Sequence, residues 1–185
     1  MISRSVLAVA AAIAVCAVPA WADNVDHAKS QISFVSKQMN VPVDGHFGKF
    51  SAQVDYDPKK PAASKAQIEV ELGSVETGSS EANTEVGKKS WFNIAAFPSA
   101  KFVSSSVKSL GPEKLEVKGN LSIKGISREM SFPVAVKTAG GSTTFEGAFP
   151  LMRLQYKIGD GVWSDTETVA DEVQVRFRIV TTANK

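Results

Sequence analysis

Hydrophobic and polar residues alternate with a period of two over most of the chain after residue 30. The pattern is clearest in residues 67–72, 115–124 and 173–179, where apolar residues or glycine alternate with polar ones. Such alternation is typical of antiparallel strands with one dry and one wet face. Less regular alternation predicts five more strands, near residues 32–34, 50–56, 101–107, 130–136 and 145–151.

Prolines and glycines mark irregular points in the weaker strands. Phe47 is out of phase with Phe50 across Gly48, which predicts a bulge. Pro133 lies on the face opposite the apolar residues, so its strand must be at an edge or bulge there. The apolar phase changes near Pro150, which predicts a register flip.

Turn residues separate these strands, and no long linker or repeat interrupts them. We therefore predict an all-β fold, an antiparallel β-barrel of about eight strands with one short helical excursion. Closure into a barrel removes exposed sheet edges and leaves an interior that is filled or holds one ligand. A sandwich of two sheets fits the same pattern.

The helical excursion is predicted in residues 83–90, with Asn83 as its N-cap. It leads into a segment, residues 91–102, with four large aromatic residues. Because the helix has only a weak apolar stripe, it must dock on the barrel. We expect Trp91 and Phe92 to cap the barrel and Phe102 to re-enter its wall.

The first 22 residues have the features of a signal peptide: Arg4, an apolar run over residues 6–18, and a small-residue cleavage site before Asp23. We expect residues 23–185 to form one exported domain without an integral membrane segment, because no later apolar run approaches the roughly 20 residues that a membrane helix needs. Cys16, the only cysteine, would leave with the signal peptide, so no disulfide is expected.

Charge and motifs argue against several functions. The sequence has 21 basic and 19 acidic residues, which does not indicate a nucleic-acid partner. Its two histidines, His27 and His46, have no metal-ligand spacing, and no nucleophile elbow or phosphate-binding loop is present. We therefore predict no metal, no cofactor and no enzymatic activity; an enzyme that uses His46 is the least favoured hypothesis.

Two arginines, Arg128 and Arg153, continue the inward phase of their strands. A charge that points inward is costly unless it is paired or near a mouth. A salt bridge at the barrel rim is one interpretation. The other is that one of them binds a polar ligand headgroup, because a guanidinium group suits phosphate or carbonyl oxygens.

The order of motifs resembles that of the YceI-like family of exported lipid- or polyisoprenoid-binding proteins. The matching segments are residues 33–34, 43–50 (VDGHFGKF), 74–78 (SVETG), 91–104, 117–128, 149–159 and the terminal strand. The resemblance covers essentially all of residues 23–185. It implies a lipocalin-like barrel with an elongated apolar cavity for an isoprenoid or similar amphiphile, a periplasmic location and, often, a homodimer.

The leading hypothesis is a non-catalytic periplasmic protein that transports or stores a long apolar chain, such as a polyprenyl quinone or polyprenyl phosphate. The alternative is a stress-related structural or interaction module with a packed core and no ligand. Small residues at inward positions, Ala52, Ser104 and Gly119, favour incomplete filling. The candidate ligand-binding residues are Phe34, Phe50, Phe102, Phe132, Phe145, Phe149 and Phe177 in the barrel, Trp91 and Phe92 at its cap, and Arg153.

Overall fold

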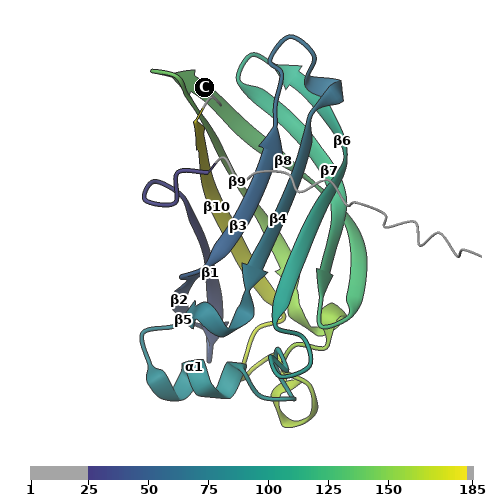
Figure 1. Ribbon diagram of the computed structural model, residues 1–185. Helices are drawn as coiled ribbons and strands as arrows, with labels where there is room; N and C mark the ends of the chain where they lie inside the picture. The colour runs from purple at the N-terminus through teal and green to yellow at the C-terminus, as the bar shows by residue number, and fades with distance from the viewer. Residues whose placement is uncertain (1–24, 183–185) are drawn as a thin grey trace, which may run out of the picture.

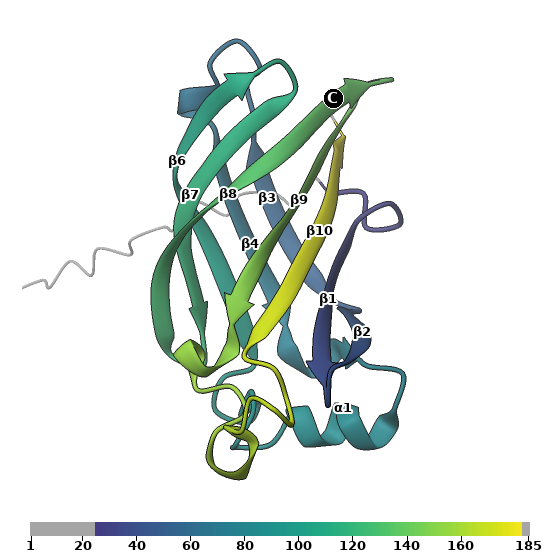
Figure 2. The same cartoon turned by 180° about the vertical axis from the view of Figure 1, so that it is seen from behind.

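The computed structural model describes residues 25–182, so the predicted signal peptide lies outside the described residues. The described chain forms one antiparallel sheet of ten strands in the order β3-β4-β6-β7-β8-β9-β10-β1-β2-β5 (Figures 1 and 2). The strands are β1 Gln31–Gln38, β2 Val41–Phe47, β3 Phe50–Asp55, β4 Lys65–Glu71, β5 Val75–Glu76, β6 Ser99–Gly111, β7 Lys114–Ile123, β8 Ile126–Ala139, β9 Ser142–Met152 and β10 Glu172–Thr182.

The sheet curls on itself because the continuous segment from β2 to β3 connects its two ends. Only Gly48 and Lys49 separate β2, which pairs with β1, from β3, which pairs with β4. Hydrogen bonds from Gly48 N to Ser74 O (2.9 Å) and from Glu71 N to Lys49 O (3.0 Å) continue the pairing across this junction. The predicted antiparallel barrel is confirmed, and the single sheet excludes the two-sheet sandwich.

The structure has two strands more than predicted, β2 and β5. Pro42 and Gly45 obscure the alternation of β2, and β5 is only two residues long. The bulge predicted at Gly48 is the junction between β2 and β3, so Phe47 and Phe50 belong to different strands.

Both prolines identified in the sequence lie where β8 and β9 separate. These strands pair only from Val134 opposite Gly147 to Ala139 opposite Ser142. Pro133 and Pro150 lie beyond this ladder, and neither has a backbone N–H to extend it. The edge position predicted for Pro133 is confirmed. The register flip predicted near Pro150 is wrong, because β9 keeps its phase to Met152 and the chain then turns into a 3₁₀ helix.

The described chain has one α-helix, α1 Ser80–Val86, which lies across one end of the barrel (Figure 1). The predicted start at Asn83 is wrong: Ser79 is the N-cap, and its side chain accepts from Ala82 N. Asn83 Oδ1 instead accepts from Thr77 N and Thr77 Oγ1, both at 2.8 Å, and so fixes the preceding loop. The 3₁₀ helices are η1 Pro61–Ala63, η2 Leu72–Ser74, η3 Arg153–Tyr156 and η4 Gly161–Trp163.

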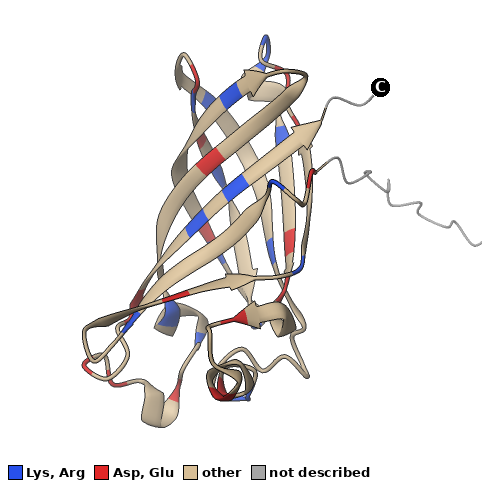
Figure 3. Ribbon diagram, turned by 90° about the vertical axis from the view of Figure 1, so that its left-hand side faces the viewer, with Lys and Arg blue, Asp and Glu red and all other residues tan. Residues whose placement is uncertain are grey.

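Charged residues lie along the strands and connections with both signs interspersed, as Figure 3 shows. The connection between β9 and β10, which contains η3 and η4, lies at the same end of the barrel as α1 (Figures 1 and 2). No helix in residues 25–182 combines the length and the apolar composition needed to cross a membrane. The polar outer face of the barrel and its dry interior place the candidate site inside.

Candidate functional site

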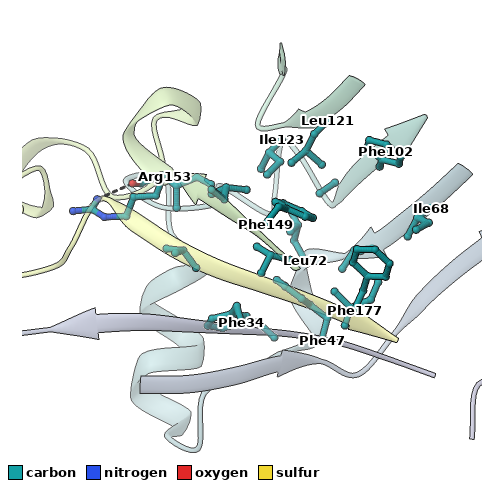
Figure 4. Close-up of a pocket in the computed structure, with 18 of the residues that line it drawn as sticks. Phe34, Phe47, Ile68, Leu72, Phe102, Leu121, Ile123, Phe149, Arg153 and Phe177 are labelled. Carbon is teal, nitrogen blue, oxygen red and sulfur yellow. Dashed lines mark hydrogen bonds between the residues drawn. The ribbon is translucent and has the colours of Figure 1, made fainter. Parts of the chain in front are cut away.

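The barrel encloses a cavity of about 750 Å³ whose walls are predominantly apolar. Protein interiors normally contain few voids larger than a water molecule. A cavity of this size favours the ligand-binding hypothesis over the packed-core alternative, and it falls within the range of roughly 300–1,000 Å³ that is typical of ligand pockets. Figure 4 shows apolar side chains from several strands around it.

The cavity contains nearly all of the side chains that the sequence identified. Every predicted ligand-binding residue except Phe50 lines it. Phe50 is half-buried at the start of β3, and its ring packs on that of His27 at a centroid distance of 5.2 Å. His27 thus covers Phe50, whereas Val54 and Tyr56, at the other end of β3, line the cavity.

Phenylalanine rings lie flat against the wall because glycines on neighbouring strands leave them room. Phe34 is opposite Gly45, and a Cβ at Gly45 would come within 2.3 Å of the ring. Phe177 is opposite Gly147, where a Cβ would come within 2.4 Å of that ring. An aromatic ring that covers a strand glycine does not project into the barrel. This arrangement helps to keep the interior open.

Phe132 joins the aromatic contacts on one side of the cavity. Its ring stacks on Phe149 at 4.9 Å, with an angle of 26° between the ring planes. It also contacts Phe102 at 5.4 Å and, edge on, Phe177 at 5.7 Å. These four rings come from β8, β9, β6 and β10, so one aromatic cluster spans much of the barrel wall.

The α1 end of the cavity is more polar. Trp91 and Trp163 line it together, with ring centroids 5.5 Å apart, and Glu81 and Glu85 of α1 lie beside them. The hydrogen bond from Lys88 is the main reason that the pKa of Glu85 is below its ordinary value, and Trp163 and Trp91 also lower it. The Nε1 of Trp91 is buried and makes no hydrogen bond of ordinary geometry within the described chain.

Arg153 has a structural role at this end. Its side chain is only 2% exposed. The guanidinium group donates to five backbone carbonyls, at 2.7–3.0 Å: those of Ala170, Ile158, Gly159, Trp163 and Val169. Burial lowers the pKa of Arg153, and the nearby Asp171 carboxylate opposes this change.

These five bonds use all five N–H donors of a guanidinium group. Arg153 lines the cavity, as Figure 4 shows, but it has no donor left for a ligand headgroup. Its partners are carbonyls and not the carboxylate of a rim salt bridge. Its function is to hold the β9–β10 connection in place, and Trp163 and Val169 of that connection line the cavity.

The predicted binding residues include the aromatic lining of the cavity but not its aliphatic lining. Ile68, Leu72, Leu121 and Ile123 also face the cavity (Figure 4). The sequence pattern indicated that these residues face inward, because most of them hold the inward phase of predicted strands. Trp163 ends the short 3₁₀ helix η4 in the β9–β10 connection, which had no such signal.

Catalytic and metal chemistry finds little support in the described residues. His46 is exposed on β2, opposite Glu76 of β5, and does not line the cavity. Within residues 25–182, no three side chains of His, Cys, Asp or Glu gather as a group that could hold a metal ion.

A curled antiparallel sheet around an apolar cavity defines a lipocalin-like barrel. A family model described as the YceI-like domain matches residues 24–181. The chain belongs to the YceI-like family, as its motifs predict.

Individual relatives agree with this assignment. A UPF0312 protein of Pseudomonas savastanoi pv. phaseolicola is 31% identical over 105 residues, 57% of this chain and 50% of the relative. Protein YceI of Salmonella arizonae is 31% identical over 96 residues, 52% of this chain and 50% of the relative. The chain thus matches about half the length of these curated relatives.

Solved structures extend the likeness to the whole barrel. The crystal structure of BcnA from Burkholderia cenocepacia has a TM-score of 0.84 and 46% identity, covering 85% of this chain and 99% of BcnA. A polyisoprenoid binding domain from Saccharophagus degradans has a TM-score of 0.71 over 86% of this chain and 97% of that one. The TM-score shows that the two share a fold, and at 18% identity the likeness is limited to the fold.

Proposed function

We propose that this protein binds a long-chain isoprenoid or similar lipid inside its barrel, in the periplasm, and that it carries or stores this lipid without covalent chemistry. The observation that carries the proposal is the apolar cavity of about 750 Å³. The family assignment supports it, as does the shared fold of a domain described as polyisoprenoid-binding.

The size of the cavity suits a long chain. A group the size of a water molecule occupies about 30 Å³. The cavity of about 750 Å³ therefore accommodates roughly 25 groups of this size, such as methylenes. Burying each CH₂ contributes about 0.8 kcal/mol. Micromolar affinity requires about 8 kcal/mol net, and association itself costs several kcal/mol. About 20 buried carbons therefore provide this affinity without a specific polar contact.

Chain length is the variable that tests the proposal. The refolded, lipid-free protein is titrated by calorimetry with quinones that carry one to eight prenyl units. We expect saturable binding of one molecule per barrel, with an affinity that rises with each unit until about 25 carbons fill the cavity and then levels off. Binding that is absent for all chain lengths, or independent of chain length, contradicts the proposal.

A pair of matched variants locates the binding. Ala100 lines the cavity, whereas Ala52 is also buried but is not among the residues that line it. Ala100→Phe is expected to occupy part of the cavity and to lower the chain length at which the affinity levels off. Ala52→Phe is expected to leave that length unchanged in the folded fraction. Equal effects of both variants would place binding elsewhere.

A further inference from the structure

The barrel wall is open along part of its length. Residues 126–133 of β8 pair with β7, and residues 148–152 of β9 pair with β10, but within the described chain these two stretches do not pair with each other. We call this opening the β8–β9 split; the two strands diverge there in Figure 2. A continued ladder would have placed Phe132 opposite Phe149.

Side chains, and not backbone hydrogen bonds, close the split. Phe132 and Phe149 stack across it on the inside. Farther along β8, Arg128 Nε donates to Gln155 O at 3.1 Å, and the Arg128 guanidinium lies 5.9 Å from the Tyr156 ring centroid. Rotation of a few side chains would therefore open the wall without breaking a strand ladder.

A second groove, of about 340 Å³, lies along the split, and we call it the outer groove. Two of its lining residues, Leu121 of β7 and Leu151 of β9, also line the interior cavity. The two spaces are therefore neighbours across a thin apolar wall. The outer groove is lined by Leu121, Ser127, Arg128, Glu129, Met130, Pro150, Leu151, Met152, Gln155 and Tyr156.

Arg128 gives the outer groove its chemistry. It holds the inward phase of β8 together with Ile126 and Met130, yet it is exposed, because no strand faces it there. Its two terminal nitrogens make no hydrogen bond or ion pair within residues 25–182. The neighbouring acid, Glu129, pairs with Lys118 at 3.0 Å. The outer groove thus presents a guanidinium group with free donors, beside the polar side chains of Ser127 and Gln155.

From this geometry we infer that the outer groove binds the polar head of the same amphiphile whose chain fills the cavity, and that the chain passes through the β8–β9 split. The inference rests on the proposed function. It specifies a head that carries anionic or strongly accepting oxygens, because a guanidinium group binds such oxygens in pairs.

The α1 end of the cavity suits such a head less well. Two carboxylates line the cavity there, Glu85, which is paired with Lys88, and Glu81, which has no ion pair within residues 25–182; Arg153 has no donor to offer. At the outer groove, in contrast, the free positive charge is next to the apolar wall through which the chain would pass.

The experiment compares a polyprenyl monophosphate with the polyprenol of the same chain length. Both are titrated into the wild-type protein, Arg128→Gln and a matched control, Arg176→Gln. Arg176 is exposed on β10 and lines neither the cavity nor the outer groove. Loss of a hydrogen bond to a charged group lowers affinity about tenfold or more.

We expect the wild type to bind the phosphate more tightly than the alcohol. Arg128→Gln should lower phosphate affinity about tenfold and leave polyprenol affinity within about twofold, while Arg176→Gln changes neither. If Arg128→Gln keeps the wild-type ratio of the two affinities, or the wild type shows no preference, the inference is overturned and the proposed function stands. If the wild type binds neither compound, the proposed function itself fails.

A second measurement tests the passage without altering Arg128. Met152→Cys places a thiol in the outer groove, and Val103→Cys places one on the exposed face of β6. After reaction with a bulky maleimide, uptake of the polyprenol is followed by stopped flow. The label at position 152 should slow uptake at least about tenfold relative to the label at position 103, since it fills the groove of about 340 Å³. Equal rates would show that the chain enters elsewhere.

Discussion

Replacing Arg153 by methionine tests whether one buried cation holds the β9–β10 connection. The variant keeps a long apolar side chain but removes five donors. Three of the five carbonyls, those of Ile158, Gly159 and Val169, accept in buried bonds. A buried polar group that loses its partner costs about 1–3 kcal/mol. The variant also avoids burying a charge, which offsets part of the loss. We expect the free energy of unfolding to fall by about 3–5 kcal/mol.

The assay is equilibrium unfolding in urea, followed by tryptophan fluorescence and by circular dichroism. Arg153→Lys, with three donors for five carbonyls, should lose an intermediate amount. The exposed Arg176→Met is the control and should stay within about 0.5 kcal/mol of the wild type. If Arg153→Met is also within about 1 kcal/mol, the carbonyls do not depend on the guanidinium group and the reasoning is refuted.

Three further predictions concern four substitutions. Gly159→Ala should destabilise the fold by about 2 kcal/mol or more. Gly159 has a φ of +72°, and an added Cβ would lie 2.3 Å from Arg153 Nη1. An unchanged melting temperature would contradict this prediction. Ala52→Phe should lower the free energy of unfolding by about 1–3 kcal/mol through overpacking. Ala100→Phe, beside the cavity, should lower it less. The urea midpoints of the two variants test this order. Burial raises the pKa of the Tyr156 phenol, so the folded state holds this proton more tightly and stability falls as the pH rises above about 10. Tyr156→Phe should lose less stability than the wild type between about pH 9 and pH 11. Equal losses would show that Tyr156 does not cause this pH dependence.

The strands were predictable because each depends on a local pattern. Residues 115–124 and 173–179 alternate strictly, and both are strands of the barrel wall. The missed strand β2 has Pro42 and Gly45 within seven residues, which local pattern analysis takes as a turn. Its pairing with β1 and β5 depends on partners distant in the chain, so tertiary contacts override the local signal.

The lining of the cavity was predictable, but its volume was not. Inward phase was sufficient to identify Phe34, Phe102 and Phe177 as interior residues. Whether such rings fill the interior depends on what they face, and that is set by register. Gly45 opposite Phe34 lets the ring lie against the wall, which the spacing within one strand does not reveal.

The role of Arg153 illustrates a different limit. Its inward phase identified it as unusual, because a buried cation needs compensation. The compensation comes from the carbonyls of residues 158–170, which lie in turns and 3₁₀ helices without a periodic signal. Arg128 has the same phase but lies at the β8–β9 split, so it reaches the outer groove. Sequence phase alone does not separate these two arginines.

The central claim is that the barrel is hollow and holds a long apolar chain. Mass spectrometry of the organic extract of natively purified protein tests it most directly, with Ala100→Phe, whose added ring would fill part of the cavity, purified in parallel. We predict that the wild-type extract contains a long-chain isoprenoid or related lipid in near-equimolar amount, and that the variant yields less of it or a shorter chain. A wild-type extract without lipid, from protein that also fails to take up a polyprenyl quinone, would contradict the account.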